Sequence, residues 1–229
     1  MGEVEWRRIA GLRVVMYWPE SGYAALPGEP RTPAPGGRTP GRLRARLAGM
    51  AGVLLIAGGG GPILPAFRVH GLSLSRSVPV SVAIPAIGVN SRLLHLGVGA
   101  DGTIAVPSLD TEANEAAWFK DSATPGQVGA SVIEGHLDSL QGPAVFFRLG
   151  ALRPGDFVDV TLADGVTAVF RVTGVREYRK TNFPAKTIYG ATDYAALRLI
   201  TCGGAFDYAT GHYLSSTVVF AILTSSRGP

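Results

Sequence analysis

The chain has 229 residues, of which 46% are hydrophobic and 17% charged, so it has room for one or two domains and is too apolar for global disorder. Its net charge is +4, but no basic face interleaved with aromatic residues indicates a nucleic-acid partner. Four scattered histidines and one cysteine lack the spacing of a metal site, so neither a metal nor another cofactor is predicted.

Residues 1–46 are basic and show no sustained periodicity. They contain eight arginines against four glutamates, and residues 28–41 are rich in Pro, Gly and Arg. This composition predicts a disordered segment on the cytoplasmic side of a membrane. A start assigned upstream of the true one is a second explanation for residues 1–40.

Residues 47–67 carry no charge and would span about 31 Å as a helix, close to the hydrocarbon thickness of a bilayer. The arginines before them predict that the N-terminus stays inside. Because glycines and a proline at 58–62 interrupt the segment, a cleaved signal peptide is the alternative to an uncleaved signal anchor. We therefore predict a single-pass plasma-membrane protein with an extracellular domain, joined to its anchor by a linker at residues 68–77.

Residues 78–224 are predicted to form one globular domain, followed by a tail at 225–229. Its predicted strands share apolar alternation or β-branched enrichment between turn residues. They are residues 78–84, 90–96, 103–106, 130–133, 156–162, 168–178, 197–202 and 217–223. Residues 111–119 are the best candidate for a short helix. Seven or eight short strands indicate an all-β barrel or sandwich, and the missing 10–15-residue helices argue against a parallel α/β sheet.

Cys202 is the only cysteine, and it ends an apolar strand at the turn Gly203-Gly204. An exported chain with one cysteine has no internal disulfide. The thiol is therefore an inert core residue, an intermolecular crosslink or a nucleophile.

His136 also emerges beside a glycine at the end of a predicted strand. A thiol nucleophile needs such a partner, because an imidazolium stabilises the thiolate and then protonates a leaving amine. The N–H groups of Gly203 and Gly204 are candidates for stabilising an oxyanion. Asp138 is a candidate for orienting His136, with a turn-capping role as the alternative.

The segments around these residues resemble the sortases, membrane-anchored transpeptidases of Gram-positive bacteria. Residues 199–202, Leu-Ile-Thr-Cys, match the family's T-L-x-T-C strand, and residues 135–138, Gly-His-Leu-Asp, match its histidine segment. Further motifs resemble the actinobacterial class E/F branch, and class F most closely. They lie at residues 84–89, 142–155, 183–184, 189–190 and 201–207, so that the resemblance covers residues 82–221.

The resemblance implies a closed eight-stranded β-barrel behind an N-terminal transmembrane helix. It also implies that the cysteine cleaves a Thr–Gly-type bond in the C-terminal sorting signal of a secreted protein. An acyl-thioester would form, and an amine acceptor on a cell-wall precursor or pilin would resolve it. By this resemblance Cys202 is the nucleophile and His136 the acid/base.

Two positions depart from the family pattern. The family has an arginine on the last strand, roughly a dozen residues after the cysteine, but here no Arg or Lys occurs between Cys202 and Ser226. The expected place is residues 213–216, and His212 is a nearby residue that can carry a positive charge. The first threonine of T-L-x-T-C is replaced by Arg198.

Arg198 shares a strand face with Cys202, but four residues of strand span about 13 Å, farther than an arginine side chain reaches. Arg198 is therefore predicted to touch substrate along the groove, with a structural role at the barrel rim as the alternative.

Two further functions remain open. A sortase-fold protein that has lost catalysis would act as a surface binding or assembly module, and the missing arginine motivates this hypothesis. Another type of cysteine peptidase is the weaker alternative, because papain-like enzymes place the cysteine before the histidine, the reverse of the order here.

Overall fold

The structure is a computed structural model, and it describes residues 71–99 and 102–229. The predicted segments at residues 1–46 and 47–67 lie outside the described residues, as do residues 68–70 of the predicted linker. Within the described ranges, no helix is both long and apolar enough to cross a membrane.

Strands dominate the described chain, and three of them have 13 or more residues. The strands are β1 (Pro79–Ile84), β2 (Val89–Leu96), β3 (Ala116–Phe119), β4 (Gly129–Glu134), β5 (Asp138–Ser139), β6 (Gly142–Pro143), β7 (Phe157–Leu162), β8 (Thr167–Arg179), β9 (Ala195–Asp207) and β10 (His212–Arg227). The helical segments are the 3₁₀ turns η1 (Pro85–Ile87), η2 (Leu149–Ala151) and η3 (Lys180–Asn182), and the helix α1 (Ala185–Tyr189). The predicted all-β class is confirmed.

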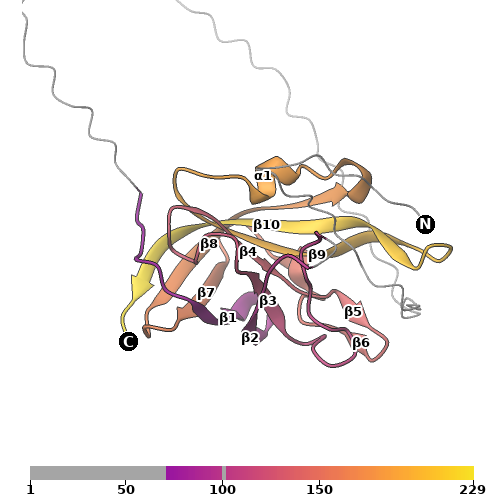
Figure 1. Cartoon of the computed structure of the whole chain (residues 1–229), viewed down its shortest axis with the longest axis horizontal. Helices are drawn as coiled ribbons and strands as arrows, with labels where there is room; N and C mark the ends of the chain where they lie inside the picture. Colours follow the sequence, from indigo (N-terminus) through magenta and orange to yellow (C-terminus); the bar gives the residue numbers. More distant parts are fainter. Residues whose placement is uncertain (1–70, 100–101) are drawn as a thin grey trace, which may run out of the picture. The chain divides into compact units, whose positions relative to one another are not determined.

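Eight strands close into a barrel in the order β1-β2-β3-β4-β9-β10-β8-β7, with β7 pairing back to β1 (Figure 1). The β2–β3 and β4–β9 pairs are parallel, and the other neighbours are antiparallel. Closure removes the sheet edges and decides between the barrel and the sandwich in favour of the barrel. Strands β5 and β6 form a separate two-stranded sheet.

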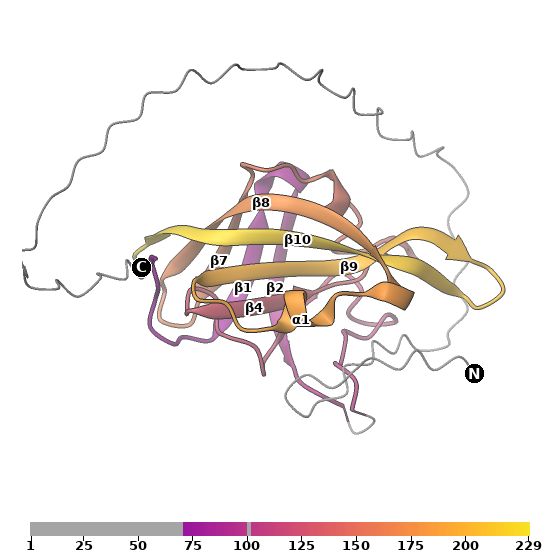
Figure 2. The ribbon, with the colours of Figure 1, turned by 90° about the horizontal axis from the view of Figure 1, so that it is seen from above.

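Strand β9 separates two apolar clusters on its two faces. Leu197 and Leu199 belong to the main core, whereas Ile200 belongs to a second cluster. The buried members of the second cluster are Val132, Phe183, Ile188, Ile200 and Val218, so residues of η3–α1 and of three strands contribute to it. Because alternate residues share a face, Cys202 points to the same side as Ile200. Figure 2 shows β8, β10 and β9 side by side, with α1 next to β9.

The predicted helix at residues 111–119 is wrong, because its second half is strand β3. Leu93 of β2 pairs with Ala116, and Ala117 pairs with Glu134 of β4. Pairing on both sides is needed to close the barrel, and it overrides the helix preference of the two alanines.

Two other predicted boundaries also changed. The predicted strand at 103–106 is reduced to one isolated bridge, in which Ile104 pairs with Val98. Strand β10 continues to Arg227, so residues 225–227 of the predicted tail pair with β8.

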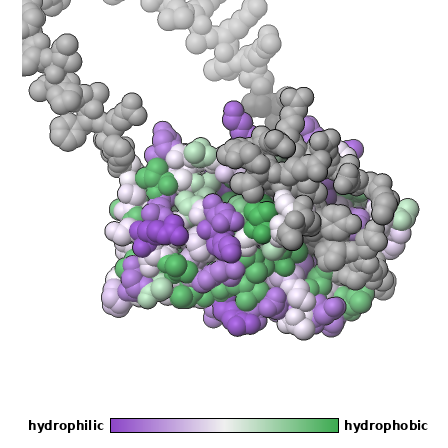
Figure 3. All heavy atoms as spheres, viewed as in Figure 1, coloured by the Kyte–Doolittle hydropathy of each residue, from purple (hydrophilic) through white to green (hydrophobic). Residues whose placement is uncertain are grey.

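The outside of the barrel is of mixed polarity. On the face shown in Figure 3, hydrophobic residues lie between hydrophilic ones, as expected where strands expose every second side chain. Among the exposed large hydrophobic residues are Phe157 of β7 and Leu214 of β10.

Candidate active site

Cys202 lies on β9 between β4 and β10. The parallel β4–β9 register places Glu134 opposite Ile200, and the N–H of Gly135 donates to the Ile200 carbonyl over 3.1 Å. This register brings the end of β4, which leads into His136, alongside the part of β9 that carries Cys202. Two residues far apart in sequence thus lie on or just after neighbouring strands. His136 is not among the residues that line the pocket at Cys202, so its pairing with the thiol stays a prediction.

His136 is fully buried, with an exposed fraction of 0%. Its Nε2 lies 2.6 Å from the carbonyl oxygen of Pro107. A carbonyl oxygen only accepts, so Nε2 carries the proton and donates, which leaves Nδ1 as the acceptor in the neutral ring. Burial lowers the pKa of His136, and the hydrogen bond to Pro107 and the charge of Asp138 oppose this shift. The neutral imidazole, which can accept a proton, is therefore favoured.

The Cys202 thiol has a cationic neighbour that the sequence analysis missed. The Nζ of Lys180 donates to Sγ over 3.5 Å. Burial, with only 3% of Cys202 exposed, raises the pKa of the thiol, and Lys180 lowers it. Two carboxylates, Asp138 and Glu134, raise that pKa further. Because burial has the larger effect, the resting thiol is protonated near neutral pH.

Strand order explains how Lys180 reaches Sγ. Cys202 pairs with Ser216 of β10, and Ser216 pairs with Tyr178 of β8. Lys180 follows β8 directly and opens η3. The lysine side chain therefore reaches Cys202 from the far side of β10. The position where the family pattern places an arginine, residues 213–216, thus contains the strand partner of Cys202.

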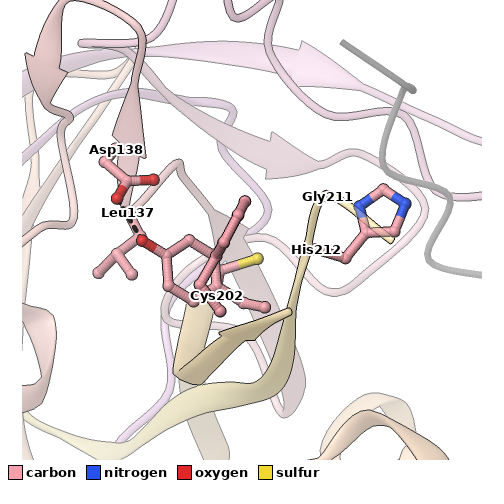
Figure 4. Close-up of a pocket in the computed structure, with 7 residues that line it drawn as sticks. Leu137, Asp138, Cys202, Gly211 and His212 are labelled. Carbon is pink, nitrogen blue, oxygen red and sulfur yellow. Dashed lines mark hydrogen bonds between the residues drawn. The ribbon is translucent and has the colours of Figure 1, made fainter. Parts of the chain in front are cut away.

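A small pocket opens at Cys202, with a volume of about 10 Å³, enough for about one water molecule. It is lined by Leu137, Asp138, Cys202, Phe206, Gly211, His212 and Tyr213. Figure 4 shows Leu137 and Asp138 on one side of Cys202, and the turn carrying Gly211 and His212 on the other. The Tyr213 hydroxyl donates to the Asp138 carboxylate, the interaction dashed in Figure 4. Asp138 is thereby fixed by Tyr213 and acts on His136 through its charge.

Gly203 and Gly204 are packed tightly against β10. A Cβ at Gly203 would lie 2.5 Å from Oγ1 of Thr217. Gly204 has a φ of 74°, and a Cβ there would lie 2.7 Å from Oγ of Ser215. The β9–β10 register shifts between Tyr213 and Ser215, so Gly204 lies at a β-bulge, a device that commonly redirects strands near active sites.

Arg198 is buried on the same face of β9 as Cys202. Its guanidinium lies 4.7 Å from the centre of the Phe220 ring, and its Nη1 donates to the Leu197 carbonyl over 3.1 Å. Only 3% of the residue is exposed, and it does not line the pocket at Cys202. These contacts describe a packed arginine; the predicted contact with substrate stays a prediction.

A buried acid lies two residues before His136. Glu134 accepts a hydrogen bond from the Tyr189 hydroxyl of α1 over 2.9 Å. Burial raises the pKa of Glu134 to about 7, with the hydrogen bond from Tyr189 acting in the opposite direction. The sequence carried no signal for this pair, because 55 residues separate its members.

Within residues 71–99 and 102–229, no group of three or more His, Cys, Asp or Glu side chains has the arrangement of a metal site. The Cys202 thiol contacts the Lys180 ammonium group, and the His136 imidazole follows the end of β4, the strand next to β9. Such a set can perform nucleophilic chemistry on an acyl group.

Comparison with known proteins identifies the family. A family model described as the sortase domain matches residues 82–224, which include Cys202 and His136. The match covers well over half of the chain, so this protein belongs to the sortase family. No curated protein matches the chain.

Several solved structures are similar to the domain. Sortase A of Listeria monocytogenes is 17% identical, with a TM-score of 0.49, over 66% of this chain and 89% of that chain. The SrtA sortase of Actinomyces oris is 20% identical, with a TM-score of 0.49, over 68% and 86%. The pilus-related sortase C of Group B Streptococcus is 16% identical, with a TM-score of 0.49, over 67% and 70%.

Proposed function

We propose that this protein is a cysteine transpeptidase that acts on the C-terminal sorting signal of secreted proteins. The observation that carries the proposal is the convergence of the single cysteine and His136 on one region of a sortase-family barrel. Cys202 is the nucleophile, and His136 is the acid and base.

The reaction has two halves. The Cys202 thiol gives its proton to the neutral imidazole of His136, and the thiolate attacks the carbonyl carbon of the scissile peptide bond. The C–N bond then breaks, the imidazolium protonates the leaving amine, and an acyl-thioester remains on Sγ. An acceptor amine attacks the thioester and loses a proton to His136, and the Cys202 thiolate leaves and is reprotonated.

The acceptor is proposed to be an amine of a cell-wall precursor or pilin, as the family resemblance implies. The class F assignment rests on the motifs at residues 84–89, 142–155 and 201–207. The uncharged residues 47–67, preceded by arginines, support a single-pass plasma-membrane protein with an extracellular domain. Membrane fractionation of the full chain and of a chain lacking residues 47–67 tests this: only the full chain should sediment with membranes.

Trapping of the acyl-enzyme tests the proposed activity. Incubation with sorting-signal peptides should give a thioester adduct at Cys202, detectable by mass spectrometry and removed by hydroxylamine. Cys202→Ala should form no adduct, and His136→Ala should form it at least about 100-fold more slowly, the usual size of general acid–base catalysis. A folded wild-type protein that binds these peptides without ever forming an adduct would instead favour the surface binding module.

A further inference from the structure

We propose that Lys180 is a catalytic residue whose ammonium group stabilises the Cys202 thiolate. The inference concerns the same site and deepens the proposed function, which it assumes for the acyl-transfer step. Its electrostatic part concerns the thiol alone and is testable without any substrate.

The first support is direct contact with the reacting atom. Nζ of Lys180 lies 3.5 Å from Sγ of Cys202, although 22 residues separate them in sequence. The row of paired residues Cys202, Ser216 and Tyr178 places the end of β8 across β10 from the thiol. Lys180 comes directly after that end, so the strand order of the barrel places its ammonium group next to Sγ.

The second support is the charge around Sγ. Burial disfavours a thiolate, and the carboxylates of Asp138 and Glu134 disfavour it further. Lys180 is the group that acts in the opposite direction, through both its charge and its hydrogen bond. Without it, ionising the thiol would place a negative charge in a buried site that already faces two acidic side chains.

The third support is the position of the other basic side chains. No Lys or Arg lies between Cys202 and Ser226 in sequence. Arg198, on the same strand, stacks on Phe220, and Arg227 pairs with Asp159. Among the basic side chains that the structure describes, the one found to contact Sγ is that of Lys180.

The proposed role is electrostatic. When Cys202 transfers its proton to His136, the electron pair stays on Sγ, and the Lys180 ammonium compensates the new negative charge. Lys180 keeps its own proton throughout and is not the base. The same ammonium remains close to Sγ while the carbonyl oxygen of the substrate acquires negative charge.

The test measures alkylation of the full-length protein by iodoacetamide between pH 5 and 10. Because Cys202 is the only cysteine, every alkylated molecule reports on this thiol. Lys180→Met keeps the aliphatic stem and removes the charge, so the alkylation rate should fall about tenfold wherever the thiol is mostly protonated, which corresponds to a rise of about one unit in the pKa of Cys202. Lys180→Arg should keep most of the wild-type rate.

Lys186→Met is the matched control. Lys186 lies on the same connection between β8 and β9, is exposed, and carries the same charge, so its removal should leave the alkylation profile unchanged. Far-ultraviolet circular dichroism and thermal unfolding verify folding. Lys180→Gln, which is also neutral, provides the same comparison if the methionine variant does not fold.

An alkylation profile of folded Lys180→Met or Lys180→Gln that coincides with that of the wild type would overturn the proposal. This outcome is separate from failure of the proposed function, which is judged by adduct formation in the wild type. If the wild type forms the thioester, adduct formation should slow at least about tenfold in Lys180→Met and recover in Lys180→Arg.

Discussion

The reactivity of Cys202 depends on a few side chains that act on one sulfur atom. Burial, Asp138 and Glu134 raise the pKa of the thiol, and Lys180 lowers it. The thiol is therefore protonated at rest, with the Lys180 ammonium group already in contact with the sulfur. A protonated, buried thiol resists oxidation, because susceptibility to oxidation follows thiolate character and exposure.

Glu134 is the residue whose protonation should be visible in the stability of the whole domain. Its pKa is raised to about 7 in the folded protein, against an ordinary value of 4.5. The folded state therefore holds more protons than the unfolded chain between these values. The stabilisation is complete below pH 4.5 and is lost as pH rises through 7.

We expect Glu134→Gln to remove this pH dependence, because the amide mimics the protonated acid and still accepts from Tyr189. The free energy of unfolding of the wild type, measured relative to that of the variant, should fall by up to about 3 kcal/mol between pH 4.5 and 8, because His136, whose pKa is lowered, contributes the same opposite slope to both proteins. Urea unfolding across this range measures both. Asp193→Asn, at an exposed carboxylate, should keep the wild-type slope; an equal slope in Glu134→Gln would contradict the prediction.

At the level of elements, the β9–β10 hairpin positions Cys202. The bulge after Gly203 shifts the register of the two strands just beyond Cys202. Gly204 has a positive φ and lies under Ser215, so the bulge requires a glycine there. The turn beyond it brings Gly211 and His212 to the pocket at Cys202.

Gly204→Ala should destabilise the domain by at least about 1 kcal/mol, because the new methyl group combines a strained φ with a clash at Ser215. Gly211→Ala is the control: its φ is 71°, and a Cβ there would meet nothing within 4 Å. The loss of unfolding free energy should be larger for Gly204→Ala, and its Cys202 alkylation rate should also change. Equal losses of unfolding free energy in the two variants would contradict the prediction, because they would mean that Ser215 moves away from the new methyl group at no cost.

The connection between β8 and β9 is the second element that defines the site. It begins with Lys180, which reaches the thiol, and continues to α1, whose Tyr189 holds Glu134. Ile188 of α1 is fully buried against the outer face of the barrel. Packing of this short connection therefore fixes two of the charged or polar contacts near Cys202.

For the described domain as a whole, closure of the eight-stranded barrel determines which strands are neighbours. Strands β8, β9 and β10 are the longest, and they lie adjacent in the order β9-β10-β8. Their inward side chains contribute nine of the 22 buried residues of the main core, which also includes residues of β1, β2, β3, β4 and β7. Cys202 lies on the face of β9 that points away from this core, so the candidate site is on the outer side of the barrel.

Phe170→Ala and Phe157→Ala compare the stability contributed by a core-facing and by an outward-facing phenylalanine. Phe170 is fully buried in the core, whereas Phe157 on the neighbouring strand is half-exposed. Truncation of Phe170 should cost about 3–5 kcal/mol of unfolding free energy, and truncation of Phe157 should cost less than about 1 kcal/mol. Chemical denaturation of both variants tests this, and similar losses would argue against the described core.

Much of the fold was predictable because its signals are local. The apolar, β-branched character of residues 168–178, 197–202 and 217–223 predicted β8, β9 and β10. The segment at residues 111–119 was predicted wrongly, because its alanines favour a helix locally and only partners on both sides make it a strand. Strand pairing is a long-range property that no window of sequence contains.

The sequence by itself determined the nucleophile candidate, its histidine partner and the all-β class, because a lone cysteine, strand ends and periodicity are properties of single segments. It also showed that the expected arginine after Cys202 is missing. Only the tertiary structure decided which residue takes a place beside the sulfur. Lys180 lies there because β8 and β9 flank β10, and this strand order is set by barrel closure rather than by any local pattern.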